Sequence, residues 1–251
     1  FNIKRLINEP TSAAFAYGIE KSKTGTFFVY DLGGGTFDIS ILKLSEGVFK
    51  VLGTSGDPVL GGDDFDFLYS SYLAKKNFDL DLNKVDVQER KRFIGYVKKI
   101  KENFESKNNF EENIKFNSIS KKIKFKKEEF NESIYKLVDK TINISKSLCD
   151  ELNITDEDVD GIILVGGSTR CEFVKEMLKD KFSTKIYDDT NPDLVVSKIF
   201  KLCLIFFIFL LTKSTNIKFP AFSVIIALLL LMKERLHGLS KSPIIFCNFG
   251  S

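Results

Sequence analysis

Apolar and polar residues alternate early in the chain in a way that predicts a β-hairpin. Residues Thr26–Leu32 form a strand run, and Thr36–Leu44 place apolar side chains on one face and polar side chains on the other. Three consecutive glycines, Gly33–Gly35, cannot form the interior of a strand and predict a tight turn between the two runs. Val48–Thr54 is a third strand candidate.

Three other segments predict helices. A short helix is expected over Pro10–Tyr17, because proline suits a first helical turn and alanine favours helix. Apolar residues recur at helical spacing in Phe93–Phe104 and Phe130–Leu148, which predicts two amphipathic helices. The alternating segment Asn113–Phe125 between them predicts a small pair of strands.

A second junction of a strand with glycines follows. Ile162–Val165 is a short buried strand that ends in Gly166–Gly167–Ser168, and a helix is expected from there through Leu178. Farther on, Asn191–Pro192–Asp193 has the composition of an N-cap, a first helical residue and an acidic first turn. This mixture of strands and helices predicts an α/β protein.

The composition changes at about Ile199. Leu202–Leu211 and Phe222–Met232 are almost wholly apolar, but each run is far shorter than the roughly 20 residues that a membrane-spanning helix needs. We therefore interpret residues 199–251 as an aberrant hydrophobic tail without a recognised domain, the product of a frameshift or a gene remnant. A re-entrant membrane anchor is the alternative interpretation.

Charge and cysteine content narrow the functional classes. The net charge of +3 lacks the concentrated basic face expected for a nucleic-acid partner. The four cysteines are far apart and form no CxxC pair, which is typical of unpaired thiols in a reducing compartment such as the cytoplasm. These residues are Cys149, Cys171, Cys203 and Cys247.

The segment from Asp31 to Asp38 carries the strongest chemical signal. Glycines let backbone N–H groups point into one concavity and approach a phosphate closely, and Thr36 adds a hydroxyl donor. The two aspartates at the ends of the turn can hold Mg²⁺ through their oxygens. The alternative for this segment is a plain glycine-rich turn.

The segment Leu164–Arg170 is a second candidate. A strand that runs into glycines at the start of a helix is a place where a nucleotide can lie against the backbone. Arg170 can stack on a purine face. Together the two loops can hold the two ends of one nucleotide.

Four blocks of this sequence resemble the seventy-kilodalton heat-shock, or DnaK, family. They occur in the family's order and spacing at residues 5–20 (RLINEPTSAAFAYGIE), 27–42 (FFVYDLGGGTFDISIL), 51–66 (VLGTSGDPVLGGDDFD) and 162–170 (IILVGGSTR). The resemblance implies the actin-like, ribonuclease H-like ATPase fold, mainly its lobe II. Residues 1–198 would be the C-terminal half of the nucleotide-binding domain, with a small α+β outer subdomain at about 75–130.

The resemblance also implies roles for individual residues. Glu9 matches the family's catalytic glutamate, and Asp31 and Asp38 match the carboxylates that organise Mg²⁺ and K⁺ around bound ATP or ADP. The second phosphate loop corresponds to Gly33, Gly34, Gly35 and Thr36. The adenosine and ribose contacts correspond to Lys101, Gly166, Gly167, Ser168, Arg170 and Asp193. Gly61, Gly62 and Asp63 match a loop less directly tied to the chemistry.

The chain also departs from the family pattern. Lys98, Glu102 and Glu105 stand where the family usually offers an acid, an arginine and a serine to adenine. This puts the adenine contacts in doubt. The short outer subdomain and the wording VKKIKENF resemble the HscA branch, which serves iron–sulfur cluster assembly.

The family resemblance implies an ATP-dependent chaperone that works with a J-domain co-chaperone on unfolded or scaffold-protein clients. The family's first phosphate loop, Asp-x-Gly-Thr-Thr, and its client-binding domain do not occur in these 251 residues, so we expect a fragment with little hydrolysis of its own. Two alternatives are a nucleotide-binding interaction module without turnover and a sugar kinase of the actin-like superfamily.

Overall fold

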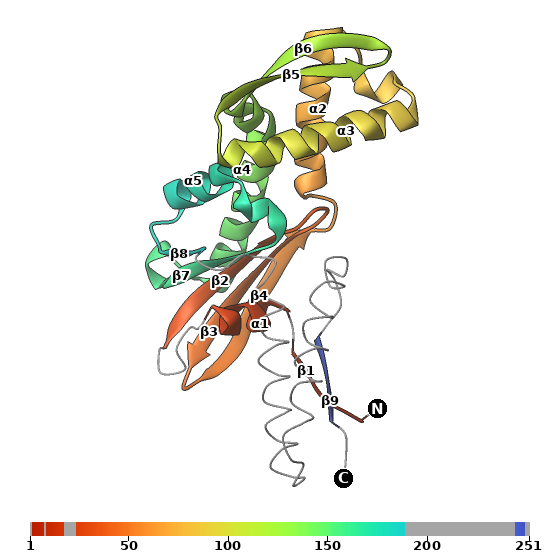
Figure 1. Ribbon diagram of the computed structural model, residues 1–251. Helices are drawn as coiled ribbons and strands as arrows, with labels where there is room; N and C mark the ends of the chain where they lie inside the picture. The colour runs from red at the N-terminus through yellow and green to blue at the C-terminus, as the bar shows by residue number, and fades with distance from the viewer. Residues whose placement is uncertain (1, 8, 18–23, 189–243, 249–251) are drawn as a thin grey trace, which may run out of the picture. The chain divides into compact units, whose positions relative to one another are not determined.

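A computed structural model describes residues 2–7, 9–17, 24–188 and 244–248 (Figure 1). The chain divides into two compact units. The larger unit spans Glu20–Asp193, and the smaller unit combines Phe1–Ile19 with Leu194–Ser251. Each unit is described by itself below.

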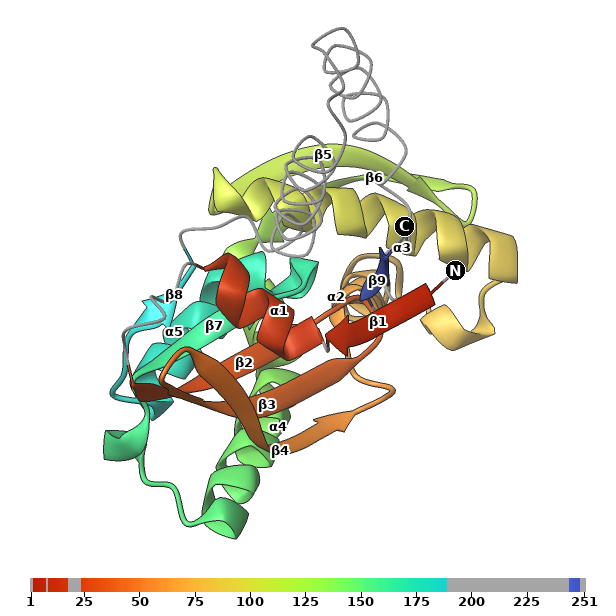
Figure 2. The same cartoon turned by 90° about the horizontal axis from the view of Figure 1, so that it is seen from below.

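The smaller unit contains a helix and a pair of strands (Figure 2). Strand β1 (Asn2–Ile7) pairs antiparallel with β9 (Ile244–Asn248), and helix α1 (Glu9–Ala16) follows β1. The helix confirms the one predicted over Pro10–Tyr17. Strand β9 comes from a part of the tail for which the sequence pattern predicts no element. The two apolar runs of the tail lie outside the described residues.

A five-stranded mixed sheet forms one half of the larger unit, in the order β4-β3-β2-β7-β8. Strands β2 (Gly25–Leu32) and β3 (Phe37–Ser45) pair antiparallel, as do β3 and β4 (Val48–Asp57). Strands β7 (Gly161–Val165) and β8 (Ile186–Tyr187) extend the sheet parallel to β2. The predicted hairpin is confirmed, and β4 continues three residues beyond its predicted end.

Helices α4 (Lys127–Leu152) and α5 (Glu172–Lys181) accompany the sheet (Figure 1). The buried face of α4 repeats every four residues, which confirms the stripe seen in the sequence. Its buried apolar side chains include Phe130, Ile134, Val138 and Ile142.

The outer part of the larger unit consists of helices capped by a hairpin. It contains α2 (Gly62–Phe78), the short helix η1 (Leu82–Lys84), α3 (Val87–Glu102), the short helix η2 (Asn103–Glu105), β5 (Asn109–Phe116) and β6 (Ile119–Lys126). Its core is aromatic: the Phe116 ring centroid lies 4.1 Å from that of Phe93 and 5.2 Å from that of Phe78. The strand pair and α3 were predicted, whereas α2 was not. Within the described ranges, none of the helices has the length and apolar character needed to cross a bilayer.

A buried hydrogen bond joins the sheet to α4. The hydroxyl oxygens of Tyr30, on β2, and Thr141, on α4, are 2.5 Å apart. The Thr141 hydroxyl donates to the carbonyl of Val138, so the Tyr30 phenol is the donor to Thr141. Burial raises the pKa of Tyr30, which keeps this donor protonated.

Replacing Tyr30 by phenylalanine should destabilise the larger unit by about 1 kcal/mol, because a neutral buried hydrogen bond is lost. Urea unfolding of the variant measures this change. The matched control is Tyr135→Phe on the exposed face of α4, which should change stability by less than about 0.5 kcal/mol. Equal effects at the two positions would contradict the assignment.

Candidate functional site

The glycine turn between β2 and β3 is closed and flanked by carboxylates. The Gly33 N–H donates to the Thr36 carbonyl at 3.0 Å, and Asp31 pairs with Asp38 directly across the hairpin. Opposed residues of an antiparallel pair point to the same face of the sheet. The turn thus brings both carboxylates to one side of the sheet.

The first turn of helix α2 fixes the orientation of the glycine turn. The N–H groups of Gly62 and Asp63 donate to the carbonyls of Gly33 and Gly34, at 3.0 and 2.7 Å. All described peptide bonds are trans, so each of these carbonyls points opposite to the N–H of the next residue. The N–H groups of Gly34 and Gly35 therefore face away from α2.

The space beside this turn suits a phosphate group. A Cβ added to Gly35 would meet nothing within 4 Å, so an oxyanion can approach the backbone there. In contrast, a Cβ on Gly61 would lie 2.5 Å from the backbone of Gly34, because α2 presses closely on the other side of the turn. The turn is thus braced on one side and open on the other.

The second glycine loop meets the same turn. Strands β2 and β7 are parallel neighbours, so their carboxyl ends lie at one edge of the sheet. The Ser168 hydroxyl donates to the Gly33 carbonyl at 2.9 Å. Gly166 has φ +86°, and a Cβ there would lie 2.4 Å from the Leu32 carbonyl oxygen, so only glycine fits.

The helix predicted after these glycines is confirmed, but its α-helical part does not begin directly after them. A short 3₁₀ helix, η4 (Gly167–Arg170), intervenes, and α5 begins at Glu172. The tighter turn results from the Thr169 hydroxyl and N–H, which both bond to the Gly166 carbonyl. Arg170, half-buried, is its last residue.

Asp31 and Asp38 fit a magnesium ion. Mg²⁺ in nucleotide sites uses one or two carboxylates, several waters and the substrate's phosphates. Neither carboxylate is buried, which leaves room for waters. The described residues contain no cluster of three or more His, Cys, Asp or Glu side chains that could hold a metal ion.

Lys101, the predicted ribose contact, lies on α3 within a group of charges. Its ammonium group is 2.5 Å from a carboxylate oxygen of Asp66, a buried residue of α2. Lys98 lies 3.4 Å from Asp63 and 3.8 Å from Asp66. Burial raises the pKa of the Asp66 carboxyl, and Lys101 opposes the shift.

Two predicted site residues do not belong to the described part of the larger unit. Glu9 is the first residue of α1 and belongs to the smaller unit. Asp193 lies outside the described residues. Their predicted roles, like those of the other site residues, remain predictions.

Comparison with known proteins identifies the family. The sequence profile of the Hsp70 protein family matches residues 1–198. The chain belongs to the Hsp70 family.

Similar proteins of known name are chaperones. The chain is 45% identical over 191 residues to a protein named Chaperone protein HscA homolog from Rickettsia bellii (strain RML369-C). This alignment covers 76% of the chain and 29% of that protein. Homologs of the same name from Rickettsia typhi (strain ATCC VR-144 / Wilmington) and Rickettsia prowazekii (strain Madrid E) are 39% and 40% identical, each over 78% of the chain. The chain spans about 30% of the length of these relatives.

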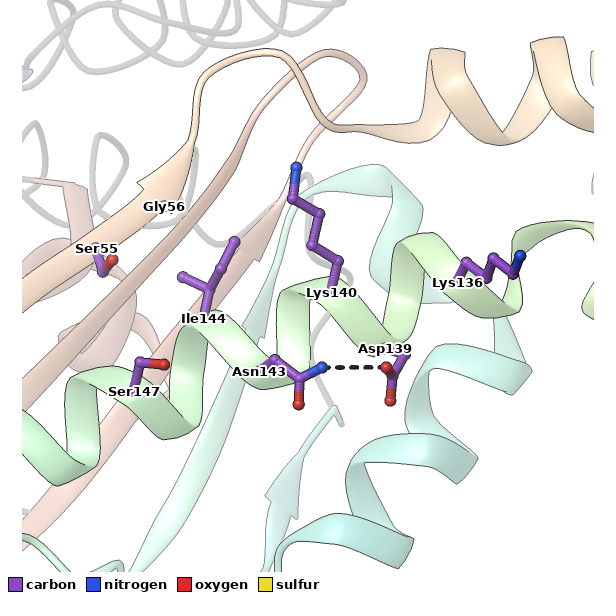
Figure 3. Close-up of a pocket in the computed structure, with 8 residues that line it drawn as sticks. All are labelled: Ser55, Gly56, Lys136, Asp139, Lys140, Asn143, Ile144 and Ser147. Atoms are coloured by element: carbon purple, nitrogen blue, oxygen red, sulfur yellow. Dashed lines mark hydrogen bonds between the residues drawn. The ribbon is translucent and has the colours of Figure 1, made fainter.

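A pocket of about 360 Å³ on this Hsp70 chain lies elsewhere (Figure 3). It is formed by β4 and α4 and lined by Ser55, Gly56, Lys136, Asp139, Lys140, Asn143, Ile144 and Ser147. None of the predicted nucleotide contacts lines it. The hydrogen-bonded loops present oriented donors and are therefore the better candidate for a nucleotide site.

The start of α2 in this Hsp70 chain contacts the glycine turn directly. The sequence predicted that Gly61, Gly62 and Asp63 form a loop less directly tied to the chemistry, yet the N–H groups of Gly62 and Asp63 hold this turn. A signal was available: two glycines followed by two aspartates are typical of a helix N-terminus.

Gly166→Ala should destabilise this Hsp70 chain by about 2–3 kcal/mol, because alanine is strained at positive φ and its Cβ would overlap Leu32. Gly35→Ala is the matched control, with open space around the new methyl group, and should change stability by less than about 0.5 kcal/mol. Thermal or urea unfolding measures both. A tolerated Gly166→Ala would contradict the close approach of the two loops.

Proposed function

We propose that this chain is the nucleotide-binding part of an ATP-dependent molecular chaperone, with lobe II of the actin-like, ribonuclease H-like ATPase fold. The observation that carries the proposal is the junction at the Gly33 carbonyl, which accepts hydrogen bonds from Gly62 and from Ser168. This junction joins the phosphate turn, the start of α2 and the adenosine loop. One nucleotide can then contact all three.

The chemistry of the loops supports ATP or ADP as the ligand. The N–H groups of Gly34 and Gly35 would face the phosphates, and Asp31 with Asp38 would hold Mg²⁺ and a monovalent ion such as K⁺. Bound Mg²⁺ would neutralise charge on the phosphates. Arg170 would stack on the purine, and Glu9 would help to place the attacking water.

We propose that the 251-residue chain binds nucleotide with little hydrolysis. Phosphoryl transfer needs charge stabilisation on all sides of the phosphate, and the described loops would contact it from one side. Saturable binding without turnover by this chain would fit a nucleotide-dependent interaction module equally well. Steady hydrolysis would favour the chaperone enzyme.

The names of the relatives support a place in protein folding. As part of a longer HscA-type protein, the chain would act in the cytoplasm with a J-domain co-chaperone on unfolded or scaffold-protein clients, including those of iron–sulfur cluster assembly. The domain boundary at residue 198 and the outer subdomain at about 75–130 belong to this proposal.

Calorimetric titration with ADP and Mg²⁺ tests the proposed function. We expect a Kd well above micromolar, because the described loops contact the phosphates from one side only. Asp31→Asn should weaken the dependence of binding on Mg²⁺, since one of two carboxylate ligands becomes neutral. Nanomolar affinity would contradict the one-sided site, and no binding at millimolar ADP would contradict the proposed function.

Replacing Arg170 by alanine should reduce the preference for purine over pyrimidine nucleotides, because the stacking surface is lost. Competition between ADP and CDP measures this preference. Arg92→Ala on α3 is the control, since Arg92 pairs with Glu89 near the start of that helix, whereas Lys101 is near its end. A selectivity unchanged in Arg170→Ala would place the base elsewhere.

A further inference from the structure

Asp66 is a buried carboxylate between the two helices of the outer part. Its side chain is 2% exposed, and the ammonium group of Lys101 lies 2.5 Å from one of its oxygens. Lys98 lies 3.8 Å away. In the part of the chain that the structure describes, these two ammonium groups are its charged partners, and its oxygens accept no other hydrogen bond.

Stability alone does not explain this arrangement. The desolvation of two buried charges offsets most of their attraction, and apolar side chains of similar volume often stabilise such a position equally well. In agreement with this, desolvation is the largest influence on the pKa of Asp66 and raises it. A buried Asp–Lys pair restricts geometry more than it contributes to the free energy of unfolding.

The position of Asp66 connects it to the phosphate turn. It lies one helical turn after Gly62 and Asp63, whose N–H groups hold the carbonyls of Gly33 and Gly34. Through Asp66 the start of α2 also holds Lys101, which is on α3. One rigid helix, α2, therefore holds both the phosphate turn and Lys101.

The side chain of Lys101 remains accessible. It is 20% exposed, whereas Asp66 is covered. An ammonium group has three protons, and an ion pair with one carboxylate oxygen leaves donors for a ligand. Lys98 is 48% exposed and also faces Asp63, so it does not replace Lys101 at Asp66.

We propose that Asp66 is a positioning residue that holds the Lys101 ammonium where it donates to the ribose hydroxyls of a bound adenine nucleotide. The inference rests on the proposed nucleotide-binding function. Asp66 itself touches no nucleotide. Removing its charge frees the Lys101 side chain to swing, so the ribose contact is lost while the phosphate contacts are kept.

Titrations with Mg·ADP and with Mg·2′,3′-dideoxy-ADP test this role, because the second ligand lacks both ribose hydroxyls. The wild-type chain should prefer ADP. Asp66→Asn should weaken ADP binding about tenfold and leave dideoxy-ADP binding unchanged, since a charged hydrogen bond is lost for one ligand only. A purely structural role would weaken both ligands alike. Asp66→Glu should recover part of the preference.

Glu129→Gln provides the matched control. Glu129 is also covered, with its side chain 13% exposed, and pairs at 2.6 Å with Lys76 of α2. That pair lies about 20 Å along the helix from Gly62. The control should keep the full preference for ADP.

The outcomes of these titrations distinguish failure of the Asp66 inference from failure of the proposed function. Lys101→Ala should lose the same preference, and the double variant with Asp66→Asn should lose no more than either alone. Additive losses, or an intact preference in Asp66→Asn, would overturn the inference and leave the proposed function standing. A wild-type chain that binds neither ligand would overturn both.

A measurement on the wild-type chain covers the case in which Asp66→Asn does not fold. Labelling the lysines with ¹³C and ¹⁵N leaves all three ammonium protons in place and gives each lysine an NMR signal. The Lys101 signal should shift on addition of Mg·ADP and remain in place with the dideoxy ligand. A Lys101 signal that ADP does not move would overturn the inference.

Discussion

The carbonyl of Gly33 is the contact on which the rest of the site depends. It receives the N–H of Gly62 and the hydroxyl of Ser168, and both hydrogen bonds have ordinary lengths of 3.0 and 2.9 Å. These donors come from residues far apart in sequence, so the bonds fasten three loops that the sheet only brings near one another. Without them the glycine turn would be free to rotate its peptide planes, and its N–H groups would have no fixed direction. An oxyanion site needs that fixed direction.

The sequence predicted those helices whose apolar residues recur over many turns. Helix α4 is the clearest case: it has 26 residues, and Phe130, Ile134 and Val138 continue its apolar stripe although Thr141 and Ser145 on the same face are polar. Helix α2 was missed although its buried positions follow helical spacing equally well. It has only 17 residues, and two of its buried positions, Asp66 and Ser70, are polar, which leaves a shorter apolar stripe for periodicity to detect. A polar residue on a buried face signals a specific partner, and here that partner proved to be Lys101 on α3.

The sequence indicated which glycine segments belong to the candidate site, but not which of these segments contact one another. Glycines at positions 33–35 and 166–167 indicate close backbone approach, but the sequence does not say which backbone approaches. The answer depends on the parallel pairing of β2 with β7, which joins segments more than 130 residues apart in register: Phe28 pairs with Ile162. Local propensity carries no information about such a pairing. For the same reason the sequence did not predict that the short 3₁₀ helix η4 precedes α5 and carries Ser168, whose hydroxyl reaches the Gly33 carbonyl.

Among the ion pairs described, burial separates those that shape the site from those that do not. Lys122 with Glu111 and Lys75 with Asp79 are short contacts, but all four side chains are largely exposed, and pairs of this kind contribute about 0–1 kcal/mol. Salt screens them, and their long side chains have alternatives in water. Asp66 has no such alternative, because water does not reach it. Among the described residues its charged partners are Lys98 and Lys101 of α3, so the approach of α3 to the start of α2 is set by this contact as well as by the aromatic core. A nucleotide that bound as proposed, between the phosphate turn and Lys101, would therefore meet two groups whose separation is already fixed, and this would spare part of the entropy cost of binding.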